Sequence, residues 1–286
     1  MNAAGLPRVG RIDFVNCFPL YLHFEEELAA RGYRAEIVPG SPAELNRLLV
    51  AGEIDVALPS SIEFARHANE LTLLPGLSIS SLGAVDSIQL FGQVERDKLR
   101  SIAVSEKSAT SITLLKVLCR EWGIAPTLAL REGPLARALA DHDGLLLIGD
   151  EALHVLRAGV YPYSYDLGEE WRAVTGLPMV YAVCAARREF AARDEAAAVA
   201  AALVASRDRC AGEAAATAAA AARLYDFSEA YLLHYFDQLK FGFTSEYRRG
   251  LAEFYGRAQA VGELDPAPDF TAVIASGPAI EATASQ

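Results

Sequence analysis

Residues 71–94 read LTLLPGLSISSLGAVDSIQLFGQV, and this stretch decides the predicted fold. It contains two extended, apolar runs in direct succession, without the helical pattern that separates the strands before and after it. Two strands with no helix between them suit a chain that leaves one sheet and enters another. We therefore expect residues 71–94 to cross between two lobes.

On the N-terminal side of this crossing, short apolar runs alternate with helical stretches. Strands are expected at 9–15, 33–38 and 54–58, and helices at 18–31, 42–51 and 62–67. This alternation is typical of a largely parallel sheet that is covered by helices on both faces.

A second α/β unit follows the crossing. Its expected strands are 101–105, 127–133 and 144–150, its expected helices are 108–123, 134–142 and 165–176, and a strand at 178–186 returns the chain. The prediction is an α/β protein of two lobes, with residues 1–86 plus 184–286 in lobe one and residues 87–183 in lobe two. Two crossings make a hinge, and a hinge creates a cleft between the lobes.

The C-terminal part has a different character. Residues 194–225 are rich in alanine and contain little glycine, serine or proline, which favours a helix over a flexible linker. Helices at 228–239 and 245–264 should follow, and we expect these C-terminal helices to pack on lobe one. From Pro266 onwards a poorly structured tail is expected.

Composition excludes several classes of function. The formal net charge is −11 and no polybasic stretch occurs, so neither a nucleic acid nor a membrane is an expected partner. The four cysteines are too scattered for a zinc site or a disulfide framework. No apolar run has the length of a membrane span, and no export signal is visible, which together predict a cytoplasmic protein.

Small polar residues follow the predicted strands, where ligands bind in open α/β sheets. They are Asn16 after the first strand, Ser60 and Ser61 after the third, Thr110 and Ser111 after Ser108-Ala109, Gly149 and Asp150 after residues 144–148, and Ser78, Ser80, Ser81 and Ser87 in the crossing. Each of them alone could be an ordinary helix cap. Together, and spread over both lobes, they predict a cleft lined with neutral donors for carboxylates.

Conventional catalytic signals are scarce. None of the five histidines lies at a predicted strand end, and no phosphate-binding loop, nucleophile elbow or dinucleotide fingerprint occurs. Cys17 could be an activated thiolate or, more in keeping with its surroundings, a small packing residue. Asp150 could act as a base or could cap the following helix, and the sequence leaves both open.

At these same positions the chain resembles the chorismate dehydratases of the futalosine route to menaquinone. The resemblance runs in order along the chain through Gly10-Arg11-Ile12, Asn16-x-x-Pro19, Asp55–Ser61, Ser108–Ser111, Ile148–Leu153, Asp166-Leu167, Trp171, Thr175–Ala182, Tyr231-x3-Tyr235-Phe236 and Gly250-Leu251-x2-Phe254. The chain departs from the family pattern in the crossing, where Ala84 replaces a proline and Leu82 a polar residue.

The resemblance implies a type II periplasmic-binding-protein-like fold and a hydro-lyase that converts chorismate to 3-(1-carboxyvinyloxy)benzoate and water, without metal or organic cofactor. It implies Asn16 as the catalytic residue. The expected substrate-binding residues are Ser60, Ser61, Ser81, Ser87, Thr110, Ser111, Gly149 and Asp150. The missing base would be the enolpyruvyl carboxylate of the substrate. Chorismate is the expected small-molecule partner, and a homodimer is left open.

Two alternatives remain at this point. The related dihydroxynaphthoate synthase shares the fold, but its N-terminal motif does not match Arg11–Asn16. A non-catalytic protein that binds small anions is the other, and it would release its ligand unchanged.

Overall fold

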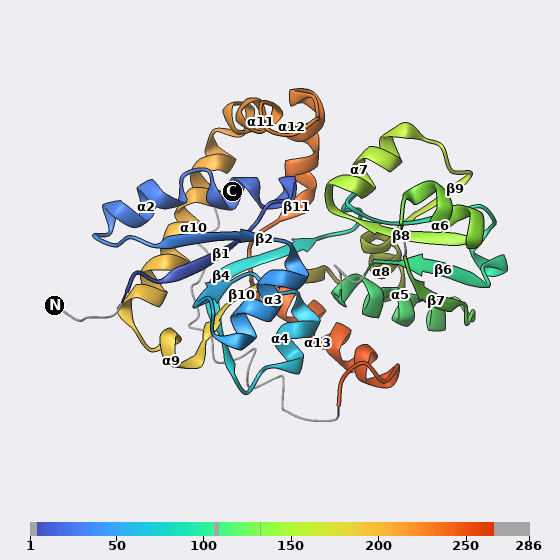
Figure 1. The fold of residues 1–286 in the computed structure, drawn as a ribbon, viewed down its shortest axis with the longest axis horizontal. Coiled ribbons are helices and arrows are strands. Elements are labelled where there is room, and N and C mark those ends of the chain that lie inside the picture. The colour runs from blue at the N-terminus through green and yellow to red at the C-terminus, as the bar shows by residue number, and fades with distance from the viewer. Residues whose placement is uncertain (1–4, 106–108, 132, 266–286) are drawn as a thin grey trace.

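The computed structural model describes residues 5–105, 109–131 and 133–265, which form two sheets flanked by helices (Figure 1). Ser108 and the tail predicted from Pro266 lie outside the described residues. The first sheet and the helices around it form lobe one, and the second sheet with its helices forms lobe two. The expected α/β architecture of two lobes is confirmed.

The sheet of lobe one has six strands in the order β11-β4-β10-β3-β1-β2. Their bounds are β1 Arg8–Ile12, β2 Glu36–Gly40, β3 Val56–Ala57, β4 Leu71–Ser81, β10 Met179–Arg187 and β11 Leu239–Lys240. β1 pairs in parallel with β2 and β3, whereas β10 runs antiparallel to both β3 and β4, and β11 runs antiparallel to β4.

The sheet of lobe two has five strands in the order β7-β6-β8-β5-β9. Their bounds are β5 Ile88–Gly92, β6 Ser101–Val104, β7 Thr127–Leu130, β8 Gly144–Ile148 and β9 Tyr163–Asp166. β6 is parallel to β7 and β8, and β5 is antiparallel to β8 and β9. The strand β9 was not expected from the sequence, which predicted only a helix in that region.

Both sheets are therefore mixed, not simply parallel, and the crossings explain why. β4 ends beside the opposite lobe, so β5 enters the second sheet from that side and runs against β8. β10 returns in the same way, with Met179 opposite Ser81, and runs against β4. Because β10 pairs with β4 from Met179 onwards, lobe one resumes before the expected boundary at residue 184.

The helix α3 shows how closely local signals can determine an element. It spans Pro42–Ala51, the range predicted from the sequence. The Ser41 hydroxyl accepts a hydrogen bond from the backbone N–H of Glu44, Pro42 stands in the first turn, and Gly52 ends the helix in the left-handed conformation.

Other helices differ from the expectation in their continuity. The predicted helix 18–31 is divided into a 3-10 helix η1 (Val15–Cys17), α1 (Phe18–Tyr21) and α2 (Phe24–Ala30). The break is stabilised from a distant element, because the Ser206 hydroxyl accepts from the backbone N–H of His23. The alanine-rich stretch is likewise two helices, α10 (Asp194–Gly212) and α11 (Ala214–Ala222), with Glu213 between them.

The remaining helices cover the two sheets. They are α4 Ser61–Arg66, α5 Ala109–Glu121, α6 Leu135–Asp141, α7 Gly149–Ala158, α8 Leu167–Thr175, α9 Arg188–Ala191, α12 Glu229–Gln238 and α13 Ser245–Ala260, with a short 3-10 helix η2 at Arg96–Lys98. The helices α10 and α11 lie on lobe one, as expected (Figure 1).

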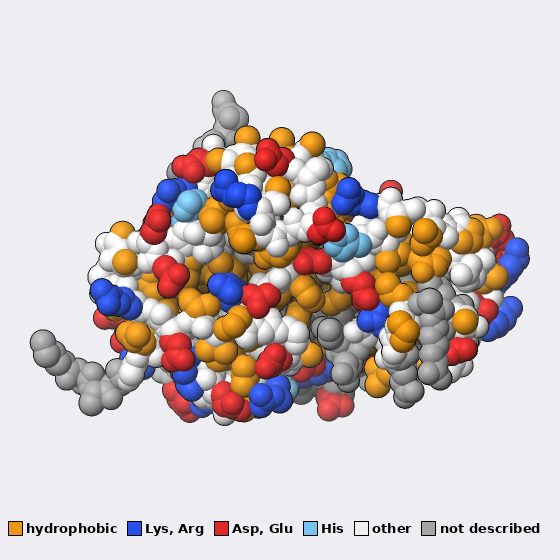
Figure 2. All heavy atoms as spheres, turned by 45° about the horizontal axis from the view of Figure 1, so that its top comes forward, with side chains coloured by type: hydrophobic (Ala, Val, Ile, Leu, Met, Phe, Trp, Pro, Cys, Tyr) orange, Lys and Arg blue, Asp and Glu red, His pale blue; other side chains and the backbone are white. Residues whose placement is uncertain are grey.

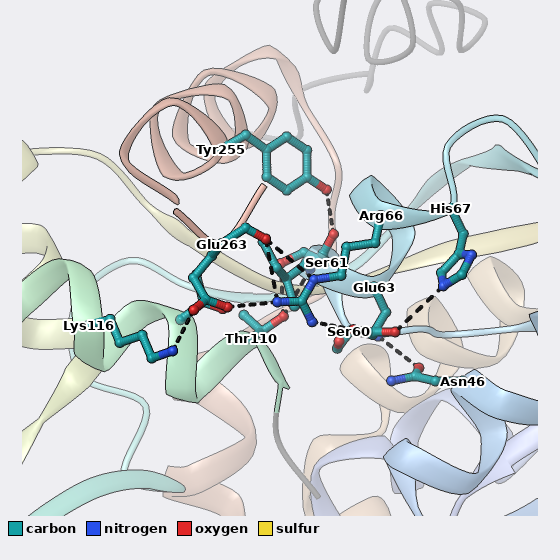
Figure 3. Close-up of polar contacts among 12 residues, drawn as sticks. Asn46, Ser60, Ser61, Glu63, Arg66, His67, Thr110, Lys116, Tyr255 and Glu263 are labelled. Atoms are coloured by element: carbon teal, nitrogen blue, oxygen red, sulfur yellow. Dashed lines mark hydrogen bonds and ion pairs between the residues drawn. The ribbon is translucent and has the colours of Figure 1, made fainter. Parts of the chain in front are cut away.

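The last helix, α13, touches both lobes. It packs on β10 of lobe one, and its Phe254 ring meets the Trp171 ring of α8 edge-on. Arg257 pairs with Glu121 of α5 at 2.7 Å, and Glu263, just beyond α13, lies between Arg66 of lobe one and Lys116 of lobe two (Figure 3). The expectation that the C-terminal helices pack on lobe one therefore holds only in part.

Candidate active site

A cavity lies between the two lobes, at the ends of the strands and at the first turns of α5 and α7. It is narrow, with a volume of about 80 Å³. The lining residues come from lobe one (Ile12, Phe14, Asn16, Pro42, Leu58, Ser60, Ile79, Tyr181, Ala182, Leu239) and from lobe two or the crossing that leads to it (Val85, Ser87, Ile88, Thr110, Ser111, Ile148, Gly149). A ligand that filled this cavity would contact both lobes.

The structure brings six of the predicted site residues to this cavity: Asn16, Ser60, Ser87, Thr110, Ser111 and Gly149. Two of them present buried oxygen atoms that have no hydrogen-bond partner among the residues that the structure describes, namely Oδ1 of Asn16 and Oγ of Ser60. Buried polar atoms are normally paired, because an unpaired one costs about 1–3 kcal/mol. Both atoms thus have capacity for the polar groups of a ligand.

Thr110 is held across the boundary between the lobes. Its hydroxyl oxygen accepts from the backbone N–H of Ile62, in the first turn of α4, at 3.1 Å. The Ser61 hydroxyl lies 3.3 Å from it and donates to the carbonyl oxygen of Val180 at 2.8 Å (Figure 3). Because the single Ser61 proton is committed to Val180, the Thr110 proton is available to Ser61 or to a ligand.

Three of the expected substrate-binding residues do not line the cavity, and neither do Ser78 and Ser80 of the crossing. Ser61 is buried behind Thr110, and the buried Ser81 hydroxyl donates to the carbonyl oxygen of Gly83 at 2.7 Å. Asp150 instead accepts a hydrogen bond from the backbone N–H of Val15 in lobe one, at 3.0 Å. It therefore neither caps its own helix nor faces the cavity, and burial raises the pKa of its carboxyl.

Tyr181 is a lining residue that the strand-end argument missed. Its hydroxyl lies 2.8 Å from the Ser81 hydroxyl, and since Ser81 donates to Gly83, Tyr181 must donate to Ser81. Burial raises the pKa of Tyr181 well above its ordinary value, so it remains a neutral phenol. The apolar lining residues were missed too, because an isoleucine or leucine at a strand end has no feature that separates it from the core.

The hinge beside the cavity is tied together by Asp166. One carboxylate oxygen accepts from the backbone N–H groups of Val85 and Asp86 and from the side chain of Gln89, all in the crossing or in β5. The other oxygen accepts from Gly168 and Glu169 at the start of α8. One carboxylate thus joins the outgoing crossing to the start of α8, and its bond to the Val85 N–H holds that lining residue in place.

The side chains with conventional catalytic chemistry lie elsewhere. Cys17 is fully buried, and burial together with the charges of Asp150 and Asp13 raises the pKa of its thiol, which favours the packing role over a thiolate. Among the residues that the structure describes, no charged side chain and no histidine lines the cavity. The described part of the chain also contains no group of side chains suited to hold a metal ion.

Comparison with known proteins assigns the chain to a family. Residues 7–260 match the family model described as menaquinone biosynthesis. The chain belongs to this family. It is 36% identical over 281 residues to the chorismate dehydratase of Thermus thermophilus, a match that covers 93% of this chain and 97% of that protein. The resemblance to chorismate dehydratases found in the sequence is thereby confirmed.

Solved structures confirm the periplasmic-binding-protein fold. A Candida albicans protein described as having the generic periplasmic binding protein fold matches with a TM-score of 0.69 and 13% identity, covering 95% of this chain and 94% of that one. The alkanesulfonate-binding protein of Xanthomonas axonopodis pv. citri, bound to MOPS, matches with a TM-score of 0.68 and 16% identity, covering 93% and 96%. At these identities the likeness establishes the fold alone.

Figure 2 shows acidic and basic side chains interspersed on the face that it presents, without a continuous basic patch. Within residues 5–105, 109–131 and 133–265, no helix is both long and apolar enough to cross a membrane.

Proposed function

We propose that this protein is a chorismate dehydratase, which converts chorismate to 3-(1-carboxyvinyloxy)benzoate and water. The observation that carries the proposal is its 36% identity to the Thermus enzyme of that name over 93% of the chain. The cavity supports it independently, since neutral donors and apolar walls suit a small dicarboxylate with an unsaturated ring.

The reaction removes the ring hydroxyl and the proton on the neighbouring, ether-bearing carbon. The ring becomes aromatic, so the protein has to lower a barrier but not to displace an unfavourable equilibrium. It must also keep the enolpyruvyl arm attached. A cavity between two lobes does both, because it orients the substrate and keeps water away from it.

The substrate carboxylates bind at the first turn of α5. Thr110 and Ser111 line the cavity there, and the free backbone N–H groups of a helix N-terminus favour a negative charge. Ser60 and Ser87 add hydroxyl donors from the other walls. Binding by neutral groups leaves the carboxylates ionised and available for chemistry.

Asn16 assists departure of the ring hydroxyl. Its side-chain oxygen is buried and has no hydrogen-bond partner in the described part of the chain, and rotation of the amide by half a turn would place the NH₂ group at the same point. A neutral amide can donate to a leaving hydroxyl or to a developing charge without ionising itself.

The base is the enolpyruvyl carboxylate of the substrate. This hypothesis is motivated by the described lining of the cavity, which offers no charged or imidazole side chain. An analogue with this carboxylate esterified should bind without reacting. Normal turnover of the ester would rule the hypothesis out.

Chromatography and mass analysis of chorismate incubated with the purified protein test the proposal and separate the alternatives. The dehydratase yields a product that is one water lighter. A solute-binding protein would return chorismate unchanged after binding it. A protein that neither binds nor converts chorismate should be tried on the cyclised futalosine substrate of the sister synthase. The cytoplasmic location and a homodimer stay predictions.

A further inference from the structure

The turn that carries Asn16 is held from the opposite lobe. The 3-10 helix Val15–Cys17 begins after Phe14, whose side chain has no oxygen to cap it. Asp150 of lobe two takes that role, since its Oδ1 accepts from the Val15 N–H at 3.0 Å. Val15 is fully buried in the folded chain, so its N–H relies on this acceptor.

One face of the lobe-two helix α7 contacts lobe one from its first turn to its last. Asp150, His154 and Arg157 are spaced to lie on one face of α7. His154 stacks on Phe227 with ring centroids 4.4 Å apart, and Arg157 lies 4.8 Å from the centroid of the Tyr231 ring. Phe14 packs directly over Gly149 at the start of the helix. The Asp150 contact therefore belongs to a continuous interface that exists only while the lobes are together.

The backbone of this turn and the side chain of Asn16 lie in different surroundings. The backbone at Val15 is bound to Asp150, whereas Oδ1 of Asn16, one residue on, is buried at the cavity and has no partner among residues 5–105, 109–131 and 133–265. Asp150 itself is not part of the cavity lining. Through Val15, this contact reaches the substrate site by way of the placement of Asn16.

We propose that Asp150 is a positioning residue, which couples closure of the lobes to the placement of the Asn16 amide at the substrate. Asn16 reaches its working position only when lobe two supplies the acceptor for the turn that carries it. This inference rests on the proposed function for the role of Asn16, but the contact between the lobes can be tested without it.

Steady-state kinetics on chorismate with three variants of the full chain test the coupling. Asp150→Ala should lower kcat about fivefold to a hundredfold, the range that corresponds to one lost buried hydrogen bond, with KM changed far less. Asp150→Asn should recover most of the loss, because its amide oxygen can still accept from Val15. Glu151→Gln is the matched control: this neighbouring carboxylate pairs with Arg131 within lobe two, and its removal should leave kcat unchanged.

An unchanged kcat in Asp150→Ala would overturn the proposal. So would an Asp150→Asn variant as slow as Asp150→Ala, because a charge and not an acceptor would then be required. Amide hydrogen exchange at Val15, measured without substrate, gives the second readout: it should quicken in Asp150→Ala and not in Asp150→Asn. If wild-type protein does not convert chorismate, the proposed function fails, while exchange at Val15 still decides whether Asp150 holds the turn.

Discussion

Gly149→Ala should reduce turnover on chorismate as well as stability. Gly149 has φ +61°, a left-handed backbone conformation in which an L side chain is strained by about 1–2 kcal/mol. An added Cβ would also lie 2.9 Å from Cδ2 of the Phe14 ring, closer than real Cβ contacts. Phe14 lines the cavity and precedes the turn of Asn16, so moving its ring either displaces Asn16 or separates the lobes.

Gly159→Ala is the matched control. Gly159 ends the same helix with φ +60°, and a Cβ there would meet nothing within 4 Å. Backbone strain should cost each variant about 1–2 kcal/mol of unfolding free energy in urea, and Gly149→Ala should lose more than Gly159→Ala, because only its Cβ meets Phe14. Only Gly149→Ala should also lower kcat/KM for chorismate by about tenfold or more, equivalent to ~1.4 kcal/mol of transition-state stabilisation. Equal kcat/KM values in the two variants would refute the reasoning.

Three further predictions follow from the described contacts. Asn16→Ala should lower kcat on chorismate by about a hundredfold while calorimetry still detects binding, because only the donor to the leaving group is lost. An unchanged kcat would show that Asn16 has no part in the mechanism. Burial raises the pKa of Cys119 and Cys184 to about 12, and a raised pKa leaves less of each thiol as thiolate at any given pH. Iodoacetamide at pH 8 should therefore label these two thiols only after unfolding, which peptide mass analysis can check. Rapid labelling of the native protein would contradict this burial. Asp166→Asn replaces one accepting oxygen at the hinge by an NH₂ group that faces N–H donors. It should lower the free energy of unfolding, measured in urea, by about 2–3 kcal/mol. A decrease below roughly 0.5 kcal/mol would show that the hinge does not depend on this carboxylate.

Local signals determined those elements whose ends are capped by neighbouring residues. Ser41, Pro42 and Gly52 mark both ends of α3, and the sequence predicted its bounds. The break before α2 could not be predicted in this way, because the acceptor for the His23 N–H is Ser206, far along the chain. The spacing of apolar residues could not predict which strands pair antiparallel, since strand direction depends on the side from which each crossing enters its sheet.

The candidate site was predictable to the extent that it lies at strand ends. Asn16, Ser60, Thr110 and Ser111 follow apolar strands in the sequence and meet at one cavity in the structure. Asp150 was grouped with them by the same rule, yet its partner is the Val15 backbone, 135 residues away. A backbone N–H leaves no trace in a sequence pattern, so only the packed lobes reveal that contact.

The most direct test of the account is a side-by-side incubation of wild-type protein and Asn16→Ala with chorismate, without added metal or nucleotide, followed by mass analysis of the reaction mixture. Wild type should form a product one water lighter than chorismate, with the enolpyruvyl group still attached, and Asn16→Ala should form it much more slowly. Chorismate recovered unchanged from the wild-type protein, or a product that has lost pyruvate, would contradict the central claim.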